Sequence, residues 1–253
     1  MLELQDFSLT GRIENINFCF APKTCYMLLG VNGAGKSSLL NAIAGQYSPR
    51  DCQGHIMLGS EPLITISAKK RATRVALLSQ HTSVMFPYQV RDIMDMGRYA
   101  QCCTSLQYQK VFDYVVENLH LQSHIDCPYH TLSDGQKQRV QLARVILQLI
   151  ADDDQKIERW LLLDEHVSNL DAYYQFESFK FIQQIINHYN IGVISAVHDM
   201  NVAARFSDNL LLINKGKLVL SGCAKEVLLS DVFKQAFRID VKYIADGHFY
   251  TLS

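Results

Sequence analysis

A run of eight residues near the start of the chain has the spacing that phosphate binding requires. Residues 30–37 read GVNGAGKS, which fits the pattern GxxxxGK[ST], and they follow the apolar run CYMLL. Glycines let a backbone close around phosphate oxygens, and amide groups at the start of a following helix face the anion. In this pattern Lys36 reaches the β- and γ-phosphates, and the Ser37 hydroxyl is a ligand for Mg²⁺. The residues expected at the nucleotide are Gly30, Asn32, Gly33, Ala34, Gly35, Lys36, Ser37 and Ser38.

A plain glycine-rich turn is the alternative for this run. Such a match arises by chance in roughly one of a hundred chains of this length. The apolar run at residues 25–29 predicts a buried strand before the turn, and residues 37–44 predict a helix after it, ended by Gly45. This context favours a nucleoside-triphosphate site.

Two acidic residues further along have the chemistry to complement a phosphate loop. Asp164 and Glu165 follow the buried run WLLL at residues 160–163. A strand there carries Asp164 to its carboxyl end, where it can orient Mg²⁺ through water. Glu165 points out of the strand and can polarise an attacking water as general base. A surface acidic pair is the commoner explanation for such residues alone, but not when they follow a phosphate loop.

Several other motifs indicate a family. Residues 132–139, LSDGQKQR, resemble the LSGGQ-x-QR signature of ATP-binding-cassette (ABC) ATPases. Gln80, the SNLD of residues 168–171 and His198 followed by Asp199 stand around it in that family's order. The resemblance covers essentially the whole chain and implies a P-loop α/β cassette that hydrolyses ATP with Mg²⁺.

The resemblance also implies a role for each motif residue. It assigns charge neutralisation to Lys36, Mg²⁺ and its water to Ser37, Gln80 and Asp164, the general base to Glu165, and the γ-phosphate and attacking water to His198. Catalysis then consists mainly of positioning and charge stabilisation, as phosphoryl transfer generally requires.

The signature run also has a local structural meaning. Ser133 with Gln136 three residues later predicts a capping box that opens a helix. The resemblance implies that this helix start presents Ser133, Gly135 and Gln136 to the γ-phosphate bound by a second copy, because a helix N-terminus attracts anions. Asp171 would communicate across the same dimer. Neither copy then has a complete site, and hydrolysis requires two cassettes closed around two ATP molecules.

Some positions depart from the family pattern. Asp134 replaces the first signature glycine, and a carboxylate about 5 Å from the triphosphate would cost about 3 kcal/mol at an effective dielectric constant near 20. The side chain can instead point into solvent. His166 stands where the family usually has proline, and Asn169 where alanine is common. The only candidate for stacking on adenine is Phe7, for which core packing is the favoured interpretation.

Buried strands that alternate with helices must position these motifs, which predicts an α/β fold with a parallel core sheet. Alternating apolar residues before residue 21 predict an antiparallel β subdomain at the sheet edge. Further strands are expected at 75–78, 160–163, 191–197 and 209–213, helices at 105–119 and 172–188, and a hairpin turn at 246–247. We expect one ABC domain over 1–253, with its core in approximately 1–83 and 159–253 and a helical subdomain in approximately 84–158.

Composition excludes several classes of protein. The chain of 253 residues is 48% apolar with a net charge of −1, which excludes a disordered chain. No apolar run approaches the ~18 residues of a membrane span, and no secretory signal is visible. Seven cysteines without a CxxC pair indicate free thiols in a reducing cytoplasm. The balanced charge gives no basic groove for nucleic acid.

Two segments narrow the branch of the family. Residues 85–98, MFPYQVRDIMDMGR, resemble the FPxTVxDVVxxGR stretch of ATPases that serve importers of iron-siderophore, haem and cobalamin. Residues 198–205, HDMNVAAR, resemble that branch's HDLNLAAR. The ending at residues 246–253, DGHFYTLS, is similar to that of the vitamin B12 importer ATPase. The acidic run at residues 152–154 is interpreted as a solvated loop.

The resemblance implies partners as well. A multi-span permease would dock near Gln80–Arg98, a substrate-binding protein would act through it, and the chain would lie in the cytoplasm on the inner face of a bacterial cell membrane. Two alternatives stay open. One is an ATP-dependent dimerisation switch with weak hydrolysis, because of Asp134, and the other is a soluble ABC protein unrelated to transport.

Overall fold

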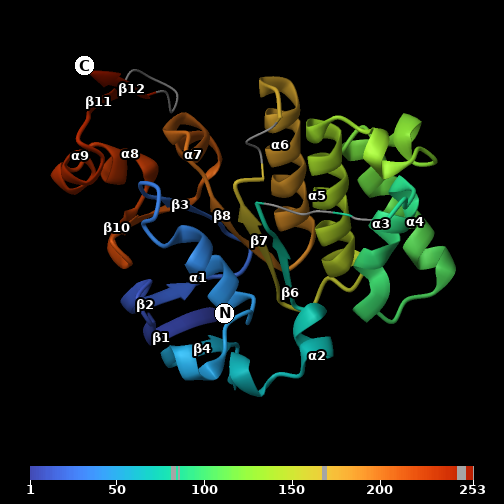
Figure 1. Ribbon diagram of the computed structural model, residues 1–253, viewed down its shortest axis with the longest axis horizontal. Helices are drawn as coiled ribbons and strands as arrows, with labels where there is room; N and C mark the ends of the chain where they lie inside the picture. Colours follow the sequence, from blue (N-terminus) through green and yellow to red (C-terminus); the bar gives the residue numbers. More distant parts are fainter. Residues whose placement is uncertain (81–83, 85, 167–169, 244–248, 253) are drawn as a thin grey trace. The chain divides into compact units, whose positions relative to one another are not determined.

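The computed structural model divides the chain into two compact units (Figure 1). The first comprises Met1–Ile66 with Gly192–Ser253, and the second comprises Ser67–Ile191. The described residues are 1–80, 84, 86–166, 170–243 and 249–252. Among them, no helix has the length and apolar character needed to cross a bilayer. The subdomain boundaries expected near residues 84 and 158 stay a prediction.

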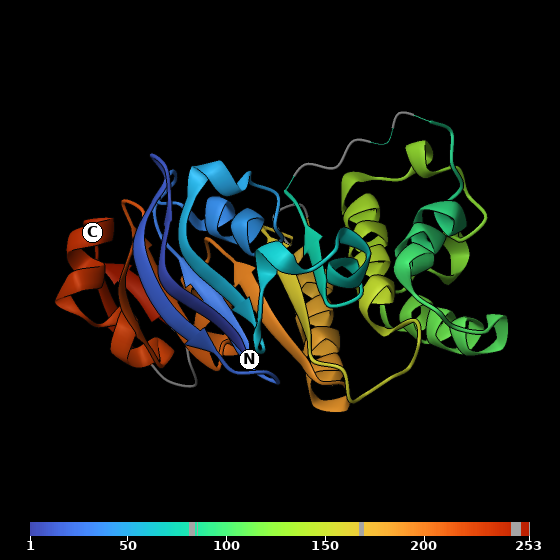
Figure 2. The ribbon, with the colours of Figure 1, turned by 90° about the horizontal axis from the view of Figure 1, so that it is seen from below.

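An antiparallel sheet opens the first unit. Its strands, in spatial order, are β2 (Ile13–Phe20), β1 (Leu2–Leu9), β4 (Cys52–Leu58) and β5 (Glu61–Pro62). Leu2 pairs with Phe20 on one side of β1 and with Leu58 on the other. The strands run together in Figure 2, in blue. Phe7 lies in β1 with 2% of its surface exposed, so the expected core packing of Phe7 is confirmed.

The first unit also contains parallel strands, helices and a terminal hairpin. Strand β3 (Cys25–Leu29) is buried along its whole length, as its apolar run predicts, and pairs in parallel with β8 (Ile191–Ala196) and β9 (Asn209–Asn214). Strand β10 (Lys217–Gly222) pairs antiparallel with β9. The helices of this unit are α1 (Lys36–Ile43), α7 (Met200–Phe206), α8 (Ala224–Leu228) and α9 (Asp231–Phe237). A terminal hairpin joins β11 (Asp240–Tyr243) to β12 (Phe249–Leu252), and its expected turn at 246–247 lies outside the described residues.

The second unit combines two parallel strands with a helical layer. Strand β6 (Val75–Leu78) pairs with β7 (Arg159–Asp164). The helices are α2 (Ala68–Ala72), α3 (Val90–Asp95), α4 (Ser105–Asn118), α5 (Asp134–Ile150) and α6 (Ala172–His188). Helix α5 packs on both strands and on α3 and α4, which lie beside it in green in Figure 1. No strand occurs between β6 and β7 in the described part, which confirms the helix-rich segment expected there.

The acidic run before β7 contacts residues of the core. Asp152 accepts two hydrogen bonds of 2.7 Å from Nη2 of Arg159, whose side chain is fully buried, and Asp153 accepts one of 2.8 Å from the Tyr189 hydroxyl. Residues 152–154 do form a loop, and Asp153 is exposed, but two of the three carboxylates also accept hydrogen bonds from residues of the core, which the sequence interpretation did not include. A buried guanidinium requires a counter-ion and acceptors, and this run supplies them.

Candidate active site

The phosphate loop joins β3 to α1 and has a backbone that only glycine fits at two points. Gly35 has φ = +110°, in the left-handed region, and it precedes the first residue of α1. A Cβ atom at Gly30 would lie 2.3 Å from the carbonyl oxygen of Ile213 in β9. Both positions exclude a larger side chain, the first by backbone strain and the second by contact. The loop therefore lies tight against the end of the sheet.

Lys36 is held within this loop. Its side chain is 5% exposed, and Nζ donates to the carbonyl oxygen of Gly30 at 2.7 Å and approaches that of Val31 at 3.5 Å. No side chain caps α1 at Gly35, so an anion can take the place of a capping oxygen at this helix start. The ammonium group and the helix start suit a polyphosphate.

The two acidic residues lie at the end of β7 in different environments. Asp164 closes the strand and is 4% exposed. Glu165 follows with φ = +53°, a left-handed backbone that costs about 1 kcal/mol for a residue with a side chain. Strain of this kind is common where a protein holds a functional group in place. His166 comes next and is fully buried, and burial lowers the pKa of its imidazole to about 3, so the ring is neutral at physiological pH.

A hydrogen bond brings two of the expected catalytic residues together. The Gln80 amide, just after β6, donates from Nε2 to Oε2 of Glu165 at 2.6 Å. Because the amide nitrogen makes this bond, the amide oxygen of Gln80 faces elsewhere. The adjacent residues 81–83, part of the expected docking segment, lie outside the described residues.

The start of α5 has the predicted capping box. The backbone amide of Gln136 donates to Oγ of Ser133 at 3.3 Å, and the backbone amide of Ser133 donates to the side-chain Oε1 of Gln136 at 2.8 Å. Asp134 turns away from this cap, because its side chain is 82% exposed and lies 3.6 Å from Nζ of Lys137. Ser133 itself is exposed at the tip of the helix.

Asp171 and His198 each lie at the edge of a helix. Asp171 is the N-cap of α6 and accepts from the Tyr174 amide at 3.0 Å. Residues 168 and 169 of the same motif lie outside the described residues. His198 is exposed after β8 and precedes Asp199, which caps α7. The first unit thus holds the phosphate loop and His198, and the second holds Gln80, Asp164, Glu165, Ser133 and Asp171.

Two residues of the signature run to which the sequence assigned no role also reach this part of the second unit. Gln138 donates from Nε2 to the Glu165 carbonyl oxygen at 3.2 Å, and the guanidinium carbon of Arg139 lies 3.9 Å from the Tyr174 ring centroid. Both belong to the LSDGQKQR run, and their place after the cap was the available signal.

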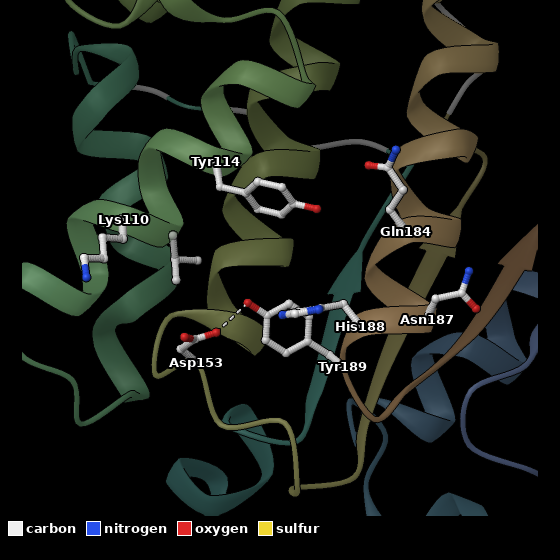
Figure 3. A pocket seen from close by; sticks show the side chains of 8 residues that line it. Lys110, Tyr114, Asp153, Gln184, Asn187, His188 and Tyr189 are labelled. Atoms are coloured by element: carbon white, nitrogen blue, oxygen red, sulfur yellow. Dashed lines mark hydrogen bonds between the residues drawn. The ribbon is translucent and has the colours of Figure 1, made fainter.

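A separate hollow of about 660 Å³ lies between α4 and α6 (Figure 3). Its lining residues are Lys110, Val111, Tyr114, Asp153, Gln184, Asn187, His188 and Tyr189. Figure 3 shows the Tyr189 hydroxyl directed at Asp153, to which it donates. None of the expected nucleotide-site residues lines this hollow.

The fold and these motifs define an ATPase of the cassette type, and the chain belongs to the ABC transporter family, whose match covers residues 13–167. It is 36% identical over 235 residues to the hemin import ATP-binding protein HmuV of Bordetella parapertussis, covering 92% of this chain and 88% of that protein. It is 30% identical over 248 residues to HmuV of Escherichia coli O157:H7, covering 95% of this chain and 92% of that protein. The protein therefore binds and hydrolyses ATP as a transporter subunit.

Solved structures agree on the fold. An inward-facing ABC transporter of the metal-chelate type contains a chain that superposes with a TM-score of 0.78 at 24% identity, covering 100% of this chain and 97% of that one. The cbiO1 subunit of Clostridium perfringens gives 0.73 at 24% identity, with 92% of each chain covered. The predicted fold class is confirmed.

Proposed function

We propose that this ATPase powers an importer of a metal chelate, and that haem is the first cargo to test. The observation that carries this proposal is the 30–36% identity, over nearly the whole chain, to proteins named as hemin import ATPases. The importer-like segment at residues 85–98 supports it. The ending that favoured cobalamin includes residues 246–248 and 253, which lie outside the described residues.

Reconstitution tests the cargo. The chain would be placed in proteoliposomes with a multi-span permease and a substrate-binding protein of the metal-chelate class. We expect haem-loaded binding protein to raise the rate of ATP hydrolysis above that of the unloaded protein, and cobalamin to have no effect. Stimulation by cobalamin alone would overturn the choice of haem, and stimulation by none of haem, cobalamin and an iron-siderophore would overturn the chelate class.

We propose that the expected site residues bind ATP together with Mg²⁺. Ser37, Gln80 and Asp164 offer hydroxyl, amide and carboxylate oxygens, which are the hard ligands that Mg²⁺ prefers. A bound Mg²⁺ would offset charge on the β- and γ-phosphates. Lys36 adds a second positive charge to the phosphates, and the loop Gly30–Gly35 surrounds them with amides. Glu165 takes a proton from the attacking water, and His198 orients that water and the γ-phosphate.

Two copies complete each site in this proposal. Ser133, Gly135 and Gln136 of one copy would meet the γ-phosphate bound by the other, and Asp171 would contact the opposite copy. The exposed position of Asp134 supports hydrolysis over a mere dimerisation switch, because its carboxylate is turned toward Lys137 and solvent. The permease would dock near Gln80–Arg98 on the cytoplasmic side of a bacterial membrane.

A substitution at the base tests the shared site. We expect Glu165→Gln to bind ATP, to stop hydrolysis and to accumulate as a closed dimer, because the amide cannot accept the proton. Gel filtration with ATP measures the dimer. Lys36→Ala is the matched control, since it should neither bind nucleotide nor dimerise. A Glu165→Gln protein that stays monomeric with bound ATP would contradict the shared site.

A further inference from the structure

The second turn of α5 reaches the residue that we propose as general base. Gln138 lies five residues after the cap Ser133, and its Nε2 donates to the carbonyl oxygen of Glu165 at 3.2 Å. Glu165 has a left-handed backbone, a conformation that a residue with a side chain does not favour by itself. The hydrogen bond from Gln138 stabilises the peptide group that follows it. The carboxylate of Glu165 meanwhile accepts from Gln80. Two glutamines therefore hold both ends of the residue.

Arg139, the next residue of α5, reaches the start of α6. Its side chain is 4% exposed, and its guanidinium carbon lies 3.9 Å from the centroid of the Tyr174 ring. Its Nη1 donates to the carbonyl oxygens of Leu119 and His120, at 2.8 and 3.0 Å. A cation over an aromatic face in a desolvated setting is a strong contact for its size. Tyr174 in turn donates its amide to Asp171.

Adjacent residues of one helix thus hold the two ends of the segment that carries the base and Asp171. We propose that Gln138 and Arg139 are positioning residues, which transmit the docking of their helix on the second copy's ATP to Glu165 and Asp171 of their own copy. A rigid helix moves both contacts when its start moves. Each site would then become competent only when its own signature helix is engaged. This inference rests on the proposed shared site.

The Tyr174 ring offers the cleanest test, because the arginine keeps its two carbonyl acceptors when the ring is removed. In the complex with the permease, we expect Tyr174→Ala to lower kcat for ATP by about 2- to 30-fold, the range of a cation–π contact, with KM changed by less than about twofold. Tyr174→Phe retains the ring and should restore kcat. Tyr173→Ala is the control for loss of a neighbouring ring: Tyr173 is 59% exposed and meets the Tyr174 ring edge-on at 5.2 Å, but its removal leaves the contact of Arg139 with Tyr174 in place and should keep the wild-type kcat. A kcat equal to that of wild type in Tyr174→Ala, whatever its melting temperature, would overturn the proposal.

Hydrogen exchange gives a second readout that needs no turnover. In a Glu165→Gln background, ATP should slow exchange at residues 133–139 and at the start of α6. Adding Tyr174→Ala should abolish the slowing in α6 and preserve it at 133–139, and equal slowing at both places would overturn the positioning role. If the Glu165→Gln protein itself shows slowing at residues 30–38 and none at 133–139, the shared site fails, and the coupling drawn from it fails with it.

Discussion

Replacement of Asp152 by alanine should destabilise the fold strongly, because it removes the counter-ion of a buried cation. Arg159 opens β7 with no exposed side-chain surface, and its Nη2 donates to both oxygens of Asp152 at 2.7 Å. Its Nη1 donates to the Asp154 carbonyl oxygen at 2.6 Å, a backbone contact that the substitution leaves in place. The change therefore removes the carboxylate that faces Arg159, together with its 3.2 Å hydrogen bond from the Asp154 backbone amide.

The expected cost follows from the geometry. With about 4 Å between the charge centres and an effective dielectric constant near 20, the attraction is about 4 kcal/mol. Removal of one partner from a buried pair commonly costs about 3–5 kcal/mol, because the other charge stays desolvated. We therefore expect the free energy of unfolding to fall by about 3–5 kcal/mol in Asp152→Ala.

Urea denaturation measures this loss, and the chain has a built-in probe. Trp160 is the only tryptophan, is fully buried and follows Arg159 directly, so its fluorescence reports on β7. Asp154→Ala is the control, because it keeps the carbonyl that Arg159 uses and removes only the acceptor of the Lys156 backbone amide, a loss of about 1 kcal/mol. If the two variants unfold at the same urea concentration, the buried pair does not stabilise β7, and the reasoning fails.

Three further outcomes can be measured on the isolated chain. Burial, with Asp208 nearby, raises the pKa of the Cys25 thiol to about 12. A thiol reagent at pH 8 should therefore label the exposed Cys102 at once and Cys25 only after denaturation. Prompt labelling of Cys25 in the folded protein would contradict this expectation. Gly97→Ala should lower the free energy of unfolding by about 1–3 kcal/mol, because a Cβ atom at this position would lie 2.3 Å from the carbonyl oxygen of Arg144 in α5. An unchanged urea midpoint would refute this close contact. Ser133→Ala should cost about 1 kcal/mol by loss of the cap, with Ser133→Asn restoring most of it; equal stability of the two variants would argue against a capping role.

Local signals predicted most of the fold. The strand limits 75–78 and the helix limits 172–188 match β6 and α6, because apolar periodicity and capping residues lie within the segments themselves. The capping box at Ser133 and Gln136 was predictable for the same reason. The pairing of Asp152 with Arg159 was not predictable, because no local sequence pattern indicates that the Arg159 side chain is buried or that it points toward Asp152.

Backbone strain and contacts between segments also escaped the sequence. Nothing in the residue type of Glu165 indicates a left-handed φ, because glycine and asparagine are the residues that favour it. The contact of Arg139 with Tyr174 joins residues 35 positions apart and depends on how α5 and α6 pack. Such pairings become visible only when the helices have been placed.

At Glu165 the residue that would stabilise the fold differs from the residue that the proposed chemistry needs, because the backbone there is left-handed. Glycine would relax that peptide by about 1 kcal/mol and would delete the carboxylate in the same step. Directed evolution that selects only for thermal stability should therefore favour Glu165→Gly, a variant without the proposed general base. A screen for sturdier variants needs a turnover assay beside it.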